Sequence, residues 1–319
     1  MINDNWCLIL YLAGNCWNDS DTEAWCTGEL FNTKLLTEKK AWREVVDMAA
    51  ENGIDSLYIN LANGIRYESH PEIAIEGAWT TDELKEELSY IYSKGLKAYP
   101  RLNFSAGHDV WLGIYSRMVS TPKYYEVVRD LIFEVCDLFN TPEMMAIEMD
   151  EENGLNQGRV QYACYRQRDL QWHDINYLCD CIRQKGVRPN IDADYFWSFP
   201  EEFLANVPRD VIISNWFYNN LYFDAARPKL TDPWSTKRLE AFKELTEAGY
   251  DLWLQGGSNE STFNFEHNVR YATENAVLDK IVGMAITGCW SPVNDSSKNY
   301  YFDAIYQAKY TREQFFGGI

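Results

Sequence analysis

The sequence predicts a single (β/α)8 TIM barrel over residues 1–319, and three observations lead to this prediction. Eight short apolar segments recur along the chain, and an amphipathic helical pattern follows each of them. Most of these segments are apolar without alternation, as parallel strands covered on both faces are. Strand-then-helix units in this number, over about 300 residues, are typical of a closed parallel barrel.

The eight predicted strands are separated by helices and loops of ordinary length. The first is the run Trp6–Leu12, which ends just before Gly14 and Asn15. In chain order, the predicted strands span residues 6–12, 54–60, 96–104, 144–150, 187–193, 210–216, 250–254 and 281–287. A doubly wound open sheet is the competing fold, but no Gly-x-Gly-x-x-Gly turn follows any of these segments.

The helices are predicted from apolar residues three and four positions apart, bounded by capping residues. Thr81 is expected to cap one helix, with Glu83 in its first turn and Gly95 at its end. In chain order, the predicted helices span residues 37–52, 81–95, 122–139, 169–184, a short segment from 200, 235–248, 268–276 and 300–309. No linker or shift in composition interrupts the pattern, which indicates one domain.

Composition supports a large folded domain and argues against two classes of partner. Hydrophobic residues make up 46% of the chain, which is enough for a sizeable core. The net charge of −19 argues against nucleic acid, whose binding needs clustered Lys and Arg, and against anionic membrane surfaces. No apolar run reaches transmembrane length. The oligomeric state does not follow from the sequence.

The eight cysteines are scattered, and several lie inside apolar segments, which indicates reduced and mostly buried thiols. We therefore expect a cytoplasmic protein as the sequence stands, and an exported one if a leader precedes residue 1. Cys179 and Cys181 have no second pair and no histidine at ligand spacing, so we expect no zinc site and no cofactor. The alternative is a metal-dependent lyase or aldolase using Asp192, Asp194 and His108.

The most informative segment is the end of the fourth predicted strand, where Ala146–Met149 run directly into Asp150, Glu151 and Glu152. A β/α barrel holds its chemistry at the carboxyl ends of its strands. Adjacent carboxylates also repel each other's ionisation, which raises one pKa toward the range of a general acid. A solvated acidic turn is the alternative interpretation, and the strand count favours a catalytic pair.

The ends of the other strands carry amides, carboxylates and aromatic rings. Amides and acids hydrogen-bond to hydroxyl groups, and aromatic rings stack on the C–H face of a sugar. We therefore expect a carbohydrate ligand, bound by side chains that follow the strands: Arg101, Asn103, His108, Asp109, Asp192, Asp194, Trp197, Trp216, Tyr218, Gln255 and Trp290. Loop bracing is the alternative role for His108, and core packing is the alternative for Trp216 and Trp290.

Several of these segments resemble the hexosaminidase-type barrels of glycoside hydrolase family 20. Asp150-Glu151 matches that family's Asp-Glu pair, and segment 100–108 is similar to its third strand, which starts with Pro and ends in Gly-His. Segment 211–216 is similar to its sixth strand, and Trp290 matches its floor tryptophan. Residues 50–295 also resemble a group of exported bacterial twin-arginine signal proteins.

The family resemblance implies an exo-acting glycosidase for terminal N-acetylhexosamine that retains configuration by substrate assistance. The substrate's acetamido oxygen would attack the anomeric carbon while Asp150 orients the acetamido N–H. Glu151 would protonate the leaving oxygen and then deprotonate water. The sequence departs from the family pattern at Ala146, where the family has His, and at Glu148, where it has Gly. A barrel that binds carbohydrate without cleaving it is the alternative function.

Overall fold

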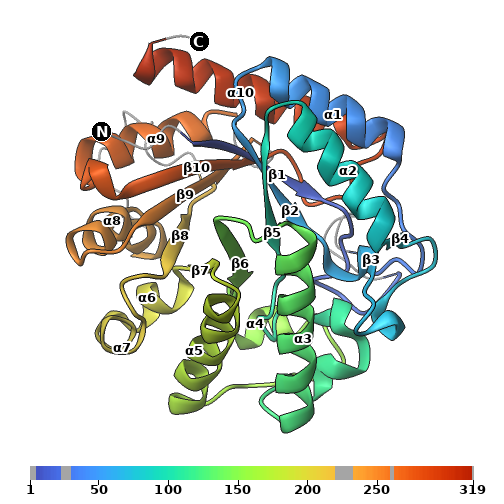
Figure 1. Ribbon diagram of the computed structural model, residues 1–319. Helices are drawn as coiled ribbons and strands as arrows, with labels where there is room; N and C mark the ends of the chain where they lie inside the picture. The colour runs from blue at the N-terminus through green and yellow to red at the C-terminus, as the bar shows by residue number, and fades with distance from the viewer. Residues whose placement is uncertain (1–4, 23–29, 220–232, 259–261, 318–319) are drawn as a thin grey trace.

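A closed barrel of parallel strands, surrounded by helices, forms the centre of the computed structural model (Figure 1). The structure describes residues 5–22, 30–219, 233–258 and 262–317. In order around the barrel, the strands are β1 (Trp6–Tyr11), β2 (Ser56–Asn60), β5 (Lys97–Arg101), β6 (Met144–Glu148), β7 (Arg188–Asp192), β8 (Ile212–Trp216), β9 (Leu252–Gly257) and β10 (Ile281–Thr287). β10 pairs in parallel with β1 and closes the barrel. The predicted (β/α)8 fold is confirmed.

Each predicted apolar segment overlaps one of these strands, but at three strands the carboxyl end differs from the prediction by two residues or more. β9 continues to Gly257, while β5 and β6 end earlier than predicted, at Arg101 and Glu148. Asp150 and Glu151 therefore belong to the loop that follows β6. In this loop Glu151 has a φ of 47°, which an extended strand would not allow.

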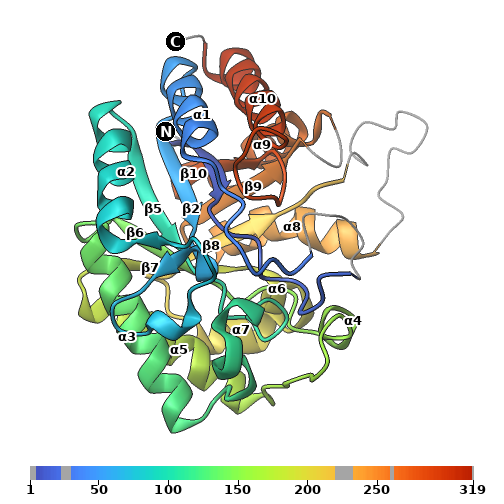
Figure 2. The same ribbon diagram turned by 90° about the vertical axis from the view of Figure 1, so that its right-hand side faces the viewer.

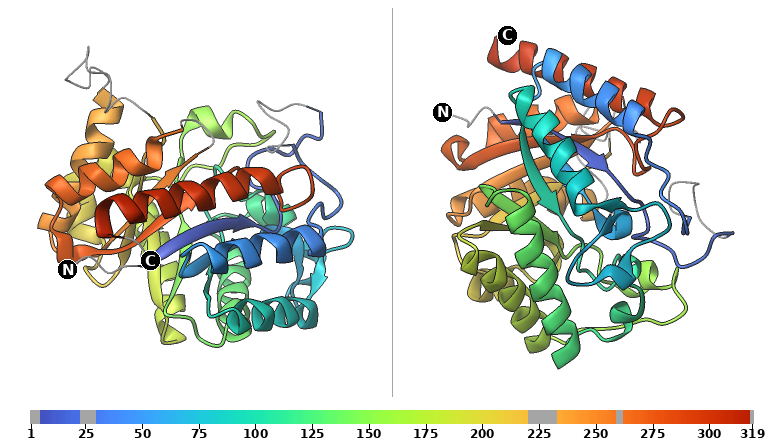
Figure 3. Two further views of the ribbon diagram at one scale, coloured as in Figure 1. Left: turned by 90° about the horizontal axis from the view of Figure 1, so that it is seen from above. Right: turned by 45° about the vertical axis from the view of Figure 1, so that its right-hand side comes forward.

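The helices surround the barrel, and Figure 2 shows the same arrangement from the side. They are α1 (Lys39–Glu51), α2 (Thr81–Ser93), α3 (Pro122–Leu138), α5 (Asp169–Gln184), α6 (Asp194–Ser198), α7 (Pro200–Asn206), α8 (Pro233–Glu247), α9 (Asn264–Asn275) and α10 (Lys298–Phe316). The last helix, α10, packs against α1 and α9, so both ends of the fold lie on the same side of the barrel (Figure 3).

The N-cap of α2 is Thr80 and not the predicted Thr81. The Glu83 amide donates to Thr80 Oγ1 at 3.1 Å, and the Thr80 amide donates to Glu83 Oε2 at 2.9 Å. This reciprocal pair is a capping box, which satisfies two backbone donors at the start of the helix. Either threonine fits the sequence pattern, and the spacing to Glu83 selects the first.

Short elements in the loops were not predicted, because segments this brief carry no periodic pattern. They are a small sheet of β3 (Ile65–Arg66) and β4 (Trp79–Thr80), the helix α4 (Gly154–Gln157), and the 3-10 turns η2 (Ala62–Gly64), η3 (Pro71–Ile73), η4 (Val110–Arg117) and η6 (Leu278–Lys280). Two of them bear on function, since η4 and α4 follow the site-bearing ends of β5 and β6.

Aromatic rings fill part of the interior of the barrel, enclosed by its strands. Tyr58 lies 6.3 Å from Tyr99 and 5.8 Å from Trp253 between ring centroids, and all three are buried. Gly283 makes room for the indole, because a Cβ at that position would lie 2.2 Å from the Trp253 ring. These rings fill this part of the barrel interior, and a β/α barrel binds its ligands at the carboxyl ends of its strands.

No helix in the described ranges combines the length and apolarity that a membrane span requires. The described cysteines are free, and most of them are buried, as expected. Cys26 lies outside the described residues.

Candidate active site

A pocket of about 400 Å³ opens at the carboxyl ends of the barrel strands. Asn60 and Arg101 are register partners on neighbouring strands there, as are Trp216 and Gln255. The pocket brings together most of the predicted site residues: Arg101, Asn103, Asp150, Glu151, Asp192, Trp216, Tyr218, Gln255 and Trp290. Side chains that are distant in the sequence therefore line the same pocket.

His108, Asp109, Asp194 and Trp197 do not line this pocket, although the sequence placed them at the same rim. His108 is buried behind the acidic pair, and Asp109 is buried where burial raises its pKa to about 8. Asp194 and Trp197 face a neighbouring hollow. His108 and Asp109 follow β5, and Asp194 and Trp197 lie in α6 after β7, so these four residues have supporting positions beside the pocket.

The pocket also contains Asn60, which the sequence places at the end of the second strand, and residues that the prediction missed: Tyr11, Cys16, Trp17, Glu148 and Arg159. Tyr11 ends β1, so the rule that selected the other strand ends would have found it. The sequence pattern does not indicate that the Glu148 side chain points into the pocket, because that direction depends on the positive φ of the residue. Arg159 comes from the loop after α4, where the sequence shows no pattern.

A buried ion pair forms the floor of the pocket. Arg101 Nη2 donates to Glu148 Oε2 at 2.8 Å, and Arg101 Nε lies 2.5 Å from Glu148 Oε1. Burial raises the pKa of Glu148, and the Arg101 charge opposes that rise. Asn103 Nδ2 then donates both to Glu148 Oε2 at 2.8 Å and to Asp150 Oδ1 at 2.7 Å. The floor therefore positions Asp150 through Asn103.

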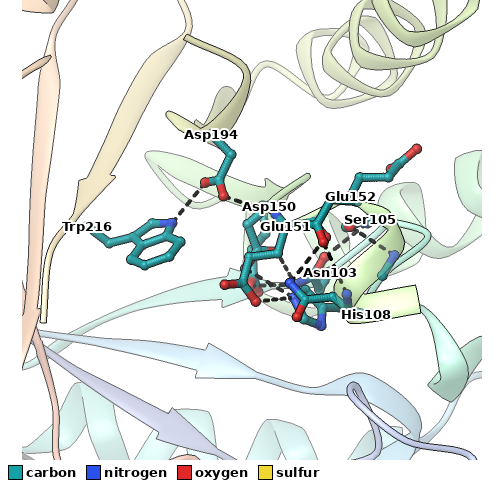
Figure 4. A network of polar contacts seen from close by, with 12 residues as sticks. Asn103, Ser105, His108, Asp150, Glu151, Glu152, Asp194 and Trp216 are labelled. Atoms are coloured by element: carbon teal, nitrogen blue, oxygen red, sulfur yellow. Dashed lines mark hydrogen bonds and ion pairs between the residues drawn. The ribbon is translucent and has the colours of Figure 1, made fainter. Parts of the chain in front are cut away.

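His108 lies between the two predicted catalytic carboxylates (Figure 4). Its Nε2 is 3.5 Å from Asp150 Oδ2 and 3.3 Å from Glu151 Oε2. Burial lowers the pKa of His108, but the charges of Asp150 and Glu151 outweigh it and raise the pKa to about 9. His108 is therefore an imidazolium at neutral pH, held by both acids.

The same contact lowers the pKa of Glu151. Burial raises it, but the hydrogen bond and the positive charge of His108 outweigh that effect. The sequence had suggested a raised pKa for one member of the acidic pair, and for Glu151 the opposite holds. The raised values belong to Asp192 and Asp194, where burial and the charge of Asp150 both act against ionisation; the pKa of Asp194 rises to about 8.

The backbone that presents the acidic pair is left-handed at three non-glycine residues, since φ is 56° at Glu148, 66° at Met149 and 47° at Glu151. Such angles are unfavourable for residues with a Cβ and persist only where surrounding contacts hold them. The Glu151 amide donates to Asp194 Oδ1 at 3.0 Å. Gly107 lies so close that a Cβ there would be 2.9 Å from the Glu151 carbonyl oxygen.

Glu152 anchors the far end of this turn and does not line the first pocket. Its Oε2 accepts from the Ala106 amide at 3.1 Å and lies 2.5 Å from Arg166 Nη1. Arg166 is buried and also pairs with Asp174 at 2.6 Å. A buried arginine between two acids thus ties the loop after β6 to α5.

Aromatic rings form one side of the pocket. Trp216 and Tyr218 are stacked with centroids 5.5 Å apart, and Trp290 meets Tyr218 edge to face at 6.0 Å. The Trp216 indole N–H donates to Asp194 Oδ2 at 2.9 Å, and Gln255 Nε2 donates to the Tyr218 hydroxyl at 2.7 Å. These contacts hold the rings in fixed orientations, as a stacking surface for a sugar requires.

Two groups of described residues bring three donor atoms within 4.8 Å of one another: His108 with Asp150 and Glu151, and Glu148 with Asp150 and Asp192. Neither is the set suggested by the sequence, which combined Asp192, Asp194 and His108. In the first group the imidazole is protonated, and in the second the acid Glu148 is already paired with Arg101. Both conditions oppose metal binding, because a metal ligand must be deprotonated and free to coordinate.

No protein-family model matches the chain, and no curated protein matches it. Solved structures do match, at low sequence identity. The β-N-acetylhexosaminidase of Bacteroides fragilis has a TM-score of 0.66 and 14% identity, with 97% of this chain and 65% of that chain covered. The exo β-N-acetylglucosaminidase of Vibrio harveyi, solved with N-acetylglucosamine, has a TM-score of 0.63 and 14% identity, with coverages of 96% and 53%.

A third similar structure is the N-acetyl-β-hexosaminidase of Streptomyces plicatus, with a TM-score of 0.61, 11% identity and coverages of 97% and 64%. The chain therefore spans between about half and two thirds of the length of these structures. At such identities the likeness establishes the fold that these proteins share. The resemblance to twin-arginine signal proteins stays a prediction.

The buried pair at the pocket floor gives a first prediction. Arg101→Met leaves Glu148 buried without its partner, which we expect to lower the free energy of unfolding by about 3–5 kcal/mol. Arg101→Met/Glu148→Met removes both charges and should recover much of that loss, because an apolar pair can replace a buried ion pair. Urea unfolding measures both variants. A double variant no more stable than Arg101→Met would contradict the pairing.

A second prediction concerns pH. The pKa of His108 is about 9 in the folded protein, whereas an unfolded histidine titrates near 6.5. Its contribution to the free energy of unfolding is therefore complete below about pH 6.5 and is lost as the pH rises toward 9; this loss is up to roughly 3 kcal/mol. We expect His108→Asn to remove this part of the pH dependence in urea unfolding.

The control for this pH experiment is His173→Asn, since His173 is an exposed histidine on α5. That variant should keep the wild-type dependence between pH 6.5 and 9. If the free energy of unfolding changed with pH equally in wild type and His108→Asn, His108 would not carry the charge assigned to it.

Proposed function

We propose that this protein is an exo-acting glycoside hydrolase that removes a terminal N-acetylhexosamine or a related sugar, with retention and substrate assistance. The observation that carries the proposal is the pair Asp150 and Glu151, joined by His108 at the mouth of an aromatic-walled pocket. The hexosaminidase structures that share the fold support the same substrate class. Roles for the two acids follow from their different surroundings.

Asp150 is the acid that would meet the substrate's acetamido group. Asn103 donates to its Oδ1 at 2.7 Å, and His108 lies 3.5 Å from its Oδ2, so the carboxylate is held from two sides. A fixed carboxylate accepts a hydrogen bond from the acetamido N–H and aligns the acetamido oxygen with the anomeric carbon. That alignment converts the attack into an intramolecular reaction, which is the main gain of substrate assistance.

Glu151 is the acid that would move the proton. Its pKa is lowered by the neighbouring imidazolium of His108, with Oε2 3.3 Å from Nε2, so it is ionised at neutral pH. A bound sugar displaces water from this side chain, which is 32% exposed, and desolvation raises the pKa of a carboxylate. The His108 Nε2 proton lies within reach of Glu151 Oε2, so the pair can deliver a proton to the leaving oxygen and recover one from water.

The end of β9 fits this mechanism. An ordinary retaining barrel uses a second carboxylate as nucleophile, about 5 Å from the acid. Here the strand carries Gln255, whose Nε2 donates to the Tyr218 hydroxyl. An amide and a phenol can bind the acetamido carbonyl, and the nucleophile is then supplied by the substrate.

A third prediction tests this function. Glu151→Gln should lower kcat by about 10²–10⁴-fold and leave the dissociation constant for the sugar nearly unchanged, because the amide keeps the shape but has no proton to give. The assay is release of a chromophore from a panel of aryl glycosides with and without a 2-acetamido group. We expect turnover only of the acetamido sugars, and the largest loss with the poorest leaving groups.

The matched control is Glu126→Gln, since Glu126 is an exposed acid on α3 that pairs with Lys123 outside the pocket. It should keep wild-type kcat. A wild-type protein that binds these sugars but cleaves none of the panel would show instead a carbohydrate-binding barrel without turnover. Activity that is lost with a chelator would favour the metal-dependent alternative.

A further inference from the structure

Three carboxyl groups, from the ends of β6 and β7 and from the turn after β6, converge at the floor of the pocket. One oxygen each of Glu148, Asp150 and Asp192 lies within 4.8 Å of the other two, and all three residues line the pocket. An atom placed centrally among these oxygens would lie no more than about 2.8 Å from each, which is the length of a hydrogen bond from a charged amine to a carboxylate.

Asp192 is the member of this group that the proposed reaction does not use. It ends β7 and is 3% exposed, and its Oδ2 has no hydrogen-bond partner among the described residues. A buried carboxyl oxygen without a partner is unfavourable. Because this oxygen belongs to a residue that lines a ligand pocket, it indicates a ligand group that donates to it.

A second buried acceptor, outside the acidic group, belongs to the same pocket. Gln255 is 3% exposed, and its Oε1 has no hydrogen-bond partner in the part of the chain that the structure describes, although its Nε2 donates to Tyr218. An amide oxygen only accepts, as an ionised carboxylate does. The ligand that completes this pocket therefore presents several donors, as a charged amine does with its three protons.

The charges around Asp192 set how it responds to a cation. Burial and then the charge of Asp150 raise the pKa of Asp192 well above its usual value. Glu148 and Asp194 act in the same direction, and Arg101 opposes them. A positive charge among the three carboxyl groups offsets their mutual repulsion, so Asp192 can give up its proton to solvent when a cation binds.

An ammonium group suits this floor better than a metal ion does. A metal ion would compete with Arg101 for the Glu148 carboxylate, whereas an ammonium needs a single lone pair of that group and leaves the ion pair in place. Its three protons also point in separate directions, so one nitrogen can donate to three carboxyl groups at once.

We propose that this pocket also binds hexosamines whose 2-amino group is free, and that they occupy it as ammonium ions and inhibit the protein without being cleaved. This inference rests on the proposed function, which places the nitrogen at C2 of the sugar beside Asp150. A free ammonium there keeps the Asp150 contact and has two further N–H donors for Asp192 and Glu148. Without an acetamido oxygen the sugar has no internal nucleophile, so the bond at the anomeric carbon stays intact.

A fourth prediction compares glucosamine with glucose, which carries a neutral hydroxyl at C2, in calorimetric titrations at about pH 6.5, where an amine of this kind is charged. We expect the wild type to bind glucosamine about 10-fold more tightly than glucose or better, because hydrogen bonds between charged groups are the stronger ones. Asp192→Asn should remove most of that difference. Asp303→Asn, at an exposed acid on α10, is the matched control and should keep it.

Proton release is a readout that a merely structural role of Asp192 would not produce. Glucosamine binding should release one proton more than N-acetylglucosamine binding does, which is measured as a dependence of the binding heat on the ionisation enthalpy of the buffer. Asp192→Asn should abolish this extra release. Binding of glucosamine without extra proton release, or equal losses of affinity for glucosamine and glucose in Asp192→Asn, would overturn the proposal.

Further outcomes separate this proposal from the proposed function. If the protein is a hydrolase, glucosamine should raise KM for a chromogenic acetamido substrate and leave kcat unchanged. If the wild type cleaves none of the aryl glycosides, the hydrolase proposal fails, and the titrations still decide whether an ammonium binds. Cleavage of an aryl glucosaminide, or binding of Mg²⁺ or Ca²⁺ alone that Asp192→Asn removes, would refute the ammonium site.

Discussion

The site depends on one constraint: the turn after β6 must hold several carboxylates close together on a left-handed backbone. Glu148, Met149 and Glu151 all have positive φ, which costs free energy at each residue. Contacts from three directions offset that cost. Arg101 and Asn103 hold the turn from β5 and its loop, Asp194 from the start of α6, and Arg166 from the loop before α5. Removing any one of these contacts leaves a buried charge or a strained peptide without support.

The same contacts shift the pKa values of neighbouring acids in opposite directions. His108 outweighs burial and lowers the pKa of Glu151, whereas burial and the charge of Asp150 raise the pKa of Asp192 and raise that of Asp194 to about 8. A protonated Asp194 still accepts from the Glu151 amide and the Trp216 indole, so it orients the turn after β6 and the aromatic side of the pocket without adding negative charge. One side chain thus links the proposed proton donor to the aromatic rings.

Much of this arrangement follows from the sequence by simple rules. Apolar runs that end at glycine or asparagine predict the strands, and the meeting of strand ends in a barrel predicts that Arg101, Asp150 and Trp216 share a pocket. The inward direction of Glu148 could not be predicted, because a strand pattern gives no sign of positive φ at a glutamate. Arg159 was missed for a different reason: it lies in the loop after α4, outside the strand ends on which the prediction relied.

The most direct test of the central claim is a crystal structure with a thiazoline analogue of N-acetylglucosamine, which mimics the intermediate of substrate-assisted cleavage. The account predicts the thiazoline ring in the first pocket, its nitrogen within hydrogen-bond distance of Asp150, and Glu151 beside the anomeric carbon. A thiazoline ring bound in the first pocket with its nitrogen turned away from Asp150, or no binding there at all, would contradict the assignment of the acidic pair.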